Sequence, residues 1–128
     1  MTIALCLNCG DTKFGAICPC PKCKVGSTGD IQLDILFSDH NFTVSTLENL
    51  GTVIKEIHLH CDNPDKCLWA FIHYISQKHP EILRVDLEPE AKQELQIVLD
   101  DCYLPVVRIV KKGWWNRIIY YVCQILKR

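Results

Sequence analysis

The sequence has few of the features that tie a chain to a membrane, to export or to nucleic acid. No apolar run approaches the ~20 residues that a membrane-spanning helix needs. The first residues carry no basic segment, no long apolar core and no small-residue cleavage site, so we expect no export and a cytoplasmic location. The 14 basic and 15 acidic residues give a formal net charge of −1, whereas nucleic-acid binding usually needs a concentrated basic surface. Nucleic acid is therefore disfavoured as the main partner.

The signatures of common enzyme classes are also missing. We find no glycine-rich phosphate loop, no nucleophile elbow and no hydrolase motif, and no internal repeat or low-complexity tract. The 128 residues are 48% hydrophobic and 23% charged, which is typical of a compact domain with a real core. The sequence thus favours a folded binding protein over an enzyme.

Cysteine, in contrast, is abundant, with nine in the chain. The odd count and the lack of an export signal argue against a disulfide frame and favour metal ligands and buried thiols. Cys6 and Cys9 are separated by two residues, and Cys20 and Cys23 repeat that spacing. Two such turns supply the four sulfurs of a tetrahedral metal site. Because four thiolates leave no open coordination position, the sequence predicts a structural metal site and not a catalytic one.

The fifth nearby cysteine and the identity of the metal need separate arguments. Cys18 forms only a Cys-x-Cys pair with Cys20, so we expect Cys18 to be the spare thiol. The alternative is a site that uses Cys18 in place of Cys20. Zinc is the expected ion, because closed all-thiolate sites are commonest for zinc, although iron of the rubredoxin type fits the same ligands.

Several short motifs share a resemblance to one protein family. They are Cys6-x-x-Cys9-Gly10, Lys13-Phe14-Gly15, Pro19-Cys20-Pro21-x-Cys23, Ser27-Thr28-Gly29-Asp30, Leu33-Asp34-Ile35 and Phe37-Ser38-Asp39-His40. Together they resemble a group of short, uncharacterised bacterial zinc-ribbon proteins, over the first half of the chain best and little after about residue 80. The resemblance implies a zinc ribbon on an α/β body in the cytoplasm, and it carries no activity. Lys24 stands where ribbon knuckles often place glycine, and Cys18 where such proteins have another residue.

The hydrophobic pattern predicts a mixed α+β fold, helix-rich and with a short sheet. A zinc ribbon over residues 1–26, with a hairpin at 3–25, precedes an α/β body over 27–128. In the body a capping box at Ser45 and Glu48 begins a helix. The expected elements of the body are a strand over 31–37, a helix over about 46–60, a helix over 64–78, a strand over 82–87, a helix from Pro89, a strand over 106–110 and a closing helix over 114–128.

A second set of potential ligands suggests an alternative function. Asp39 and His40 follow the expected strand at 31–37, where α/β folds place ligands, and His58 and His60 come later, near Cys61, Cys67 and His73. These residue types could form an open zinc site and make the chain a metal-dependent enzyme. However, His58 and His60 would point about 200° apart on a helix. The simpler interpretation is surface histidines and small buried thiols.

The closing segment suggests the partner. Its aromatic and aliphatic residues cover well over half of a helix, and such a broad apolar surface is normally buried on more than one side. We therefore expect a protein partner or a homo-oligomer through this helix, and hence a zinc-binding interaction or adaptor module. The alternative is a membrane surface or nucleic acid, bound through an aromatic and basic set: Trp114, Trp115, Tyr120, Tyr121, Lys111, Lys112, Lys127 and Arg128.

Overall fold

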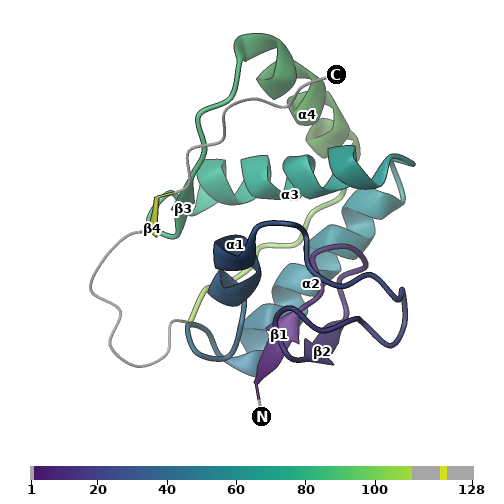
Figure 1. Ribbon diagram of the computed structural model, residues 1–128. Coiled ribbons are helices and arrows are strands. Elements are labelled where there is room, and N and C mark those ends of the chain that lie inside the picture. The colour runs from purple at the N-terminus through teal and green to yellow at the C-terminus, as the bar shows by residue number, and fades with distance from the viewer. Residues whose placement is uncertain (1, 111–118, 121–128) are drawn as a thin grey trace. The chain divides into compact units, whose positions relative to one another are not determined.

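The computed structural model describes residues 2–110 and 119–120, which form helices joined by short strands and loops (Figure 1). The chain divides into two compact units. Unit 1 comprises the described residues of Met1–Lys55 and Pro105–Trp115, and unit 2 those of Glu56–Leu104 and Asn116–Arg128. Both contain helices and short strands, so the predicted helix-rich, mixed α+β fold is confirmed. The expected division into a zinc ribbon over residues 1–26 and a body over 27–128 is of another kind, because it separates the part that folds around a metal from the rest. It stays a prediction.

Unit 1 starts with a small antiparallel sheet. β1 (Ile3–Leu5) pairs with β2 (Thr12–Phe14), with Ile3 opposite Phe14 and Leu5 opposite Thr12. Residues 37–39 run along the other edge of β1, since the Leu5 N–H donates to the Phe37 carbonyl (2.9 Å) and the Asp39 N–H to the Ile3 carbonyl (2.8 Å). The cysteine loops extend from this sheet.

The segment expected to be a strand over 31–37 is instead a helix, α1 (Ile31–Leu36). The alternation of Ile31, Leu33 and Ile35 suggested one buried face, but Ile31 and Ile35 are exposed and the buried positions follow helical spacing. The helix forms because Asp30 caps its N-terminus by accepting a hydrogen bond from the Leu33 N–H at 3.1 Å. The side-chain cap thus favours a helix, although the alternation of hydrophobic and polar residues is typical of a strand.

The next helix, α2 (Val44–His58), begins two residues before the predicted start and ends two residues before the predicted end. The predicted capping box at Ser45 and Glu48 is wrong: the Thr46 N–H donates to the Thr43 hydroxyl at 3.2 Å, so Thr43 caps the helix. Its buried face consists of Leu47, Leu50, Val53, Ile54 and Ile57. The last turn of the helix, from Glu56, belongs to unit 2.

Residues 106–110, expected to form a strand, belong to no strand in the described part of the chain. Val110 instead meets the start of α2: its N–H donates to the Thr46 hydroxyl (3.1 Å), and its carbonyl accepts from the Thr43 N–H (3.2 Å). Isolated hydrogen bonds to a helix terminus satisfy this backbone without a sheet ladder.

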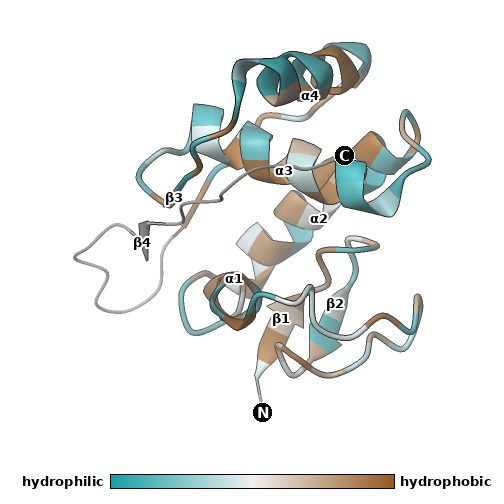
Figure 2. Ribbon diagram, turned by 45° about the horizontal axis from the view of Figure 1, so that its top comes forward, coloured by the Kyte–Doolittle hydropathy of each residue, from teal (hydrophilic) through white to brown (hydrophobic). Residues whose placement is uncertain are grey.

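Unit 2 is built on α3 (Pro64–Lys78) and α4 (Pro89–Asp101), and Figure 2 shows polar and apolar residues interleaved along both. The predicted bounds of α3 are confirmed. Asn63 caps it, accepting from the backbone N–H groups of Asp65 and Lys66, and Pro64 occupies the first turn. The predicted start of α4 at Pro89 is confirmed as well. None of the helices in the described part of the chain has the length and apolar character needed to span a membrane.

The strand predicted over 82–87 is shorter than expected. Only β3 (Leu83–Arg84) forms, and it pairs in parallel with β4 (Ile119–Tyr120). The closing helix predicted over 114–128 lies outside the described residues, except at Ile119 and Tyr120, where β4 replaces it.

Candidate metal centre

The first cysteine loop leaves β1 and turns tightly back toward β2. The Gly10 N–H donates to the Cys6 carbonyl (2.8 Å), and the Cys6 N–H donates to the Asp11 carbonyl (2.8 Å). Gly10 has a φ of 87°, a left-handed conformation that costs glycine little. The turn thereby directs the Cys6 and Cys9 side chains to the same place.

The second loop repeats this pattern bond for bond. The Lys24 N–H donates to the Cys20 carbonyl (2.8 Å), and the Cys20 N–H donates to the Val25 carbonyl (2.9 Å). Lys24 takes the place of Gly10 and adopts a φ of 68°, although it is not glycine. Because the match aligns Cys20 with Cys6 and Cys23 with Cys9, the repeated turn assigns Cys20 to the cluster.

The structure brings together the four cysteines that the spacing predicts. The sulfur atoms of Cys6, Cys9, Cys20 and Cys23 all lie within 4.8 Å of one another. The Cys6–Cys23 and Cys9–Cys20 sulfur distances are 3.5 and 3.6 Å. A tetrahedral ion with metal–sulfur bonds of about 2.3 Å needs sulfurs about 3.8 Å apart, while a disulfide needs about 2.05 Å. The four sulfurs therefore fit a metal ion and not two disulfides.

Cys18 stands outside this group and is exposed. Its carbonyl has a structural role: the ammonium of Lys13 donates to it at 2.8 Å and to the Gly26 carbonyl at 3.4 Å. Lys13 is buried, and these bonds fix both ends of the second loop. Sequence reasoning missed this role, because a lysine in a short strand gives no signal that its side chain is buried.

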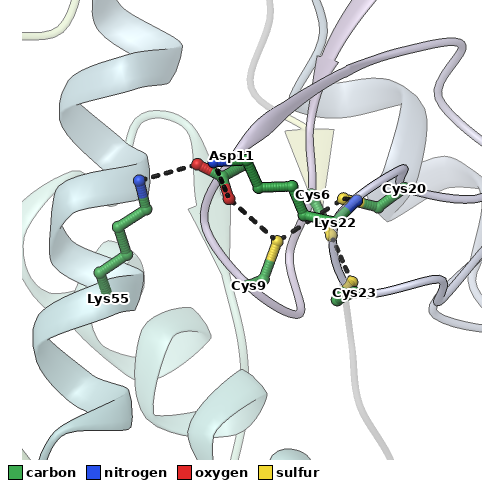
Figure 3. A network of polar contacts seen from close by, with 7 residues as sticks. All are labelled: Cys6, Cys9, Asp11, Cys20, Lys22, Cys23 and Lys55. Atoms are coloured by element: carbon green, nitrogen blue, oxygen red, sulfur yellow. Dashed lines mark hydrogen bonds and ion pairs between the residues drawn. The ribbon is translucent and has the colours of Figure 1, made fainter.

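The first loop is held against α2 by close packing and by charge. A Cβ atom on Gly51 would lie 2.0 Å from the Gly10 carbonyl oxygen, so the loop and the helix meet backbone to backbone. Figure 3 shows Lys55 of α2 reaching Asp11, with Nζ and Oδ1 2.8 Å apart, and Cys9 on the other side of the carboxylate. This contact links the cluster to the main helix of unit 1.

The surroundings of the cluster shift the pKa values of its thiols in different directions. Burial raises the pKa of Cys6 and the pKa of Cys9, since a thiolate is costly away from water. Burial also acts to raise the pKa of Cys23, but hydrogen bonds from the Asn8 side chain and the Val25 backbone outweigh it and lower that pKa to about 7. A bound cation favours the thiolate at every ligand, so ion binding and proton release are linked here.

The second set of potential ligands, which the sequence offered as an alternative, forms no metal site within either unit of the described chain. Asp39 and His40 belong to unit 1, and His58 and His60 belong to unit 2. In residues 2–110 and 119–120 the four cysteines form the one group of three or more potential ligands with the spacing that a metal requires. His40 contacts the Thr2 hydroxyl (3.3 Å), and His60 contacts the Glu56 carboxylate (3.2 Å).

His73 of this set, and Ser38 next to Asp39, have structural partners. The hydroxyl of Ser38 donates to the Ile35 carbonyl at 2.7 Å, at the end of α1 and not of a strand. His73 is buried in α3, with Nε2 3.2 Å from the amide oxygen of Gln96. These contacts hold the fold together and leave the cysteine cluster as the candidate site.

Comparisons with protein-family models, with curated proteins and with solved structures found no match. The fold and the site by themselves define a class: a small mixed α+β protein with a four-cysteine cluster arranged to bind a metal ion.

Proposed function

We propose that this chain is a zinc-binding protein whose four-cysteine site is structural. The main support for this proposal is that four sulfur atoms lie within 4.8 Å of one another, on two loops with the same backbone hydrogen bonds. Zinc suits an all-thiolate tetrahedral set, and a shell of four thiolates excludes water and substrate. The resemblance to bacterial zinc-ribbon proteins supports the same ion.

The metal would stabilise the cysteine loops of unit 1 and the short sheet from which they extend. β1 and β2 have three residues each, and residues 37–39 add only two hydrogen bonds along the other edge of β1. Strands this short contribute little stability by themselves, so an ion that joins both loops would add folding free energy to the contacts with α2. Cys6 and Cys20 are buried. If the ion is lost, water does not reach their thiols, so hydration does not compensate for the lost metal–sulfur bonds.

Metal analysis of the full chain, purified without added metal, tests this proposal. We expect one equivalent of zinc, lost in Cys6→Ser, Cys9→Ser, Cys20→Ser and Cys23→Ser. Cys18→Ser is the matched control and should keep the zinc. Cobalt substitution should give the strong sulfur-to-metal absorption of a tetrahedral thiolate site. Iron in place of zinc would contradict the ion, and full zinc retention in Cys20→Ser would contradict the ligand set.

We also propose that the zinc-stabilised unit serves protein interaction. Phe14, Ile17, Ile31 and Ile35 have exposed side chains, and the three isoleucines line a pocket of about 290 Å³ that His40 also borders. Exposed apolar clusters of this kind mark interaction sites more often than single exposed residues do. The simplest partner is a second copy of the chain.

Sedimentation velocity over a range of protein concentrations tests this interaction. We expect self-association that weakens in the double variant Ile31→Ser, Ile35→Ser, because these side chains would be buried between copies. Ile97→Ser is the control, since Ile97 is also exposed but lies on α4 in unit 2. A wild-type protein that stays monomeric at every concentration would contradict the proposed self-association. The predicted partner contacts of residues 114–128 lie outside the described structure and stay a prediction.

A further inference from the structure

Unit 2 contains a second group of cysteines, which the metal site does not use. Cys61 lies in the loop before α3, Cys67 in the second turn of α3, and Cys102 directly after α4. The thiol of Cys67 donates to the carbonyl oxygen of Cys61 at 3.2 Å. The sulfur of Cys61 lies 3.8 Å from the carbonyl oxygen of Asn63, the residue that caps α3. The Cys61 and Cys67 sulfurs are thus held around the same short turn.

The two thiols differ in access to solvent. Cys67 is buried, with 3% of its surface exposed, whereas Cys61 is half-buried. A small reagent therefore reaches Cys61 first. Cys61 also lies outside regular structure, and so its side chain can move toward Cys67 without breaking a helix.

Burial, assisted by nearby acidic groups, opposes thiolate formation in this group. Burial raises the pKa of Cys67 to about 12, with further contributions from the Cys61 thiol, Asp62 and Cys102. Burial likewise raises the pKa of Cys102 to about 11, assisted by Glu56 and Asp101. Dithiol proteins that oxidise others keep their reduced form by stabilising a thiolate. These surroundings give no such stabilisation, so no stabilised thiolate biases the pair toward its reduced form.

The geometry does not favour a second metal site here. In the described part of the chain, Cys61, Cys67 and Cys102 do not lie close enough together to count as a set of three ligands. Two thiolates alone would leave half of a tetrahedral shell unfilled. A bond between two neighbouring sulfurs needs neither a third ligand nor an ion.

We propose that Cys61 and Cys67 form a redox-active dithiol that low-molecular-weight disulfides oxidise to an intramolecular disulfide. In the first step the Cys61 thiolate attacks one sulfur of the small disulfide, which forms a mixed disulfide and releases one small thiol. In the second step Cys67, after losing its proton, attacks the Cys61 sulfur and releases the second small thiol. Two electrons and two protons pass from the protein to the reagent. The new bond joins the loop after α2 to the body of α3.

The sequence provides a direct test, because Lys66 lies between the two cysteines. Trypsin cleavage after Lys55, Lys66 and Lys78 places Cys61 in peptide 56–66 and Cys67 in peptide 67–78. The full chain is equilibrated with excess zinc in buffers of oxidised and reduced glutathione, alkylated, digested and analysed by mass spectrometry. We expect peptides 56–66 and 67–78 to be joined by a disulfide under oxidising ratios and separated again by reduced glutathione.

Single variants separate the two steps. Cys67→Ser should accumulate glutathione on Cys61, because the second thiol is missing, and Cys61→Ser should leave Cys67 alkylated as a free thiol. Cys18→Ser, the matched control, should form the linked peptides as the wild type does. The proposal is overturned if the two peptides stay separate and alkylated at the most oxidising ratio, or if either joins another cysteine peptide, such as 93–108 with Cys102. The readout does not depend on the metal site, since the peptides contain none of its cysteines.

Discussion

Gly10 and Gly51 face each other without room for a side chain: a Cβ atom on Gly51 would lie 2.0 Å from the Gly10 carbonyl oxygen. This contact, together with the 2.8 Å ion pair of Asp11 and Lys55, seats the first cysteine loop on α2. Glycine inside a helix normally costs about 1 kcal/mol relative to alanine. The close approach explains why glycine stands at position 51 in the middle of α2.

The first prediction is that Gly51→Ala destabilises the protein despite the better helix propensity of alanine. The added methyl group forces the loop away from α2, and overpacking of this kind costs about 1–3 kcal/mol of unfolding free energy. Chemical denaturation with zinc present measures the loss. Gly26→Ala is the control, since a Cβ atom there would lie 3.6 Å from the Ile17 carbonyl oxygen, an ordinary contact. A Gly51→Ala protein as stable as the wild type would contradict the packing.

The second prediction concerns Lys24, which has a φ of 68° in the second cysteine loop. A left-handed conformation costs a non-glycine residue about 1–2 kcal/mol, and replacement by glycine removes that cost. Because glycine also has more freedom in the unfolded chain, part of this gain in stability is cancelled. Lys24→Gly should therefore raise the unfolding free energy by about 0.5–1 kcal/mol and slow the loss of zinc to a chelator.

The comparison variant for this loop is Lys24→Ala. It removes the hydrogen bond from the Lys24 ammonium to the Pro21 carbonyl (2.9 Å) and keeps the backbone strain. We expect it to be no more stable than the wild type. Equal stability of the glycine and alanine variants would show that the strain at position 24 has no measurable cost.

The parts of the fold that local chemistry determines were predictable from the sequence. The bounds of α3 follow from Asn63 and Pro64, which act within one turn of the helix, and the cysteine cluster follows from the two-residue spacing in each loop. Both signals need no knowledge of distant residues. They describe geometry that a few neighbouring residues fix by themselves.

The failures arise where polar contacts of single side or main chains, and not the hydrophobic pattern, decide the structure. Residues 31–37 alternate like a strand, but α1 forms because Asp30 caps it and Asp34 binds the preceding turn. Residues 106–110 are rich in β-branched side chains, yet the Val110 backbone bonds to the start of α2. The Asp30 cap is local, but the alternation of apolar residues after it favoured a strand. The partner of Val110 lies 64 residues away in the sequence, and the carbonyl partners of the buried Lys13 ammonium give no pattern that marks them.

The third prediction tests the turn that directs residues 31–36 into a helix. The carboxylate of Asp34 is buried and accepts hydrogen bonds from the Ser27 hydroxyl (2.5 Å), the Thr28 hydroxyl (2.9 Å) and the Thr28 N–H (3.2 Å). Asp34→Ala leaves these donors without their acceptor and should lower the unfolding free energy by about 2–3 kcal/mol. Glu48→Ala, an exposed change on α2, should have little effect. An equal loss in both variants, measured by chemical denaturation, would contradict a special role for Asp34.

The last prediction concerns pH and His73. Burial lowers the pKa of His73 below its ordinary value, and the charge of Lys92 acts in the same direction, while the hydrogen bond to Gln96 partly opposes them. Below about pH 6.5 the unfolded chain therefore binds a proton at this position that the folded chain does not. The unfolding free energy should fall as the pH drops from about 6.5 toward the lowered pKa, and this contribution is fully present above that range.

Replacing His73 by glutamine removes this proton and should flatten the pH dependence of stability below about pH 6.5. The informative quantity is the difference in unfolding free energy between wild type and His73→Gln at each pH, because acid release of the metal affects both proteins alike. Some slope should remain in the variant, since burial also lowers the pKa of His79. His58→Gln is the control, because His58 lies at the end of α2 and is only partly buried. A wild-type-minus-variant difference that stays constant from pH 7 to pH 5 would show that His73 takes up its proton equally well in the folded and unfolded chains.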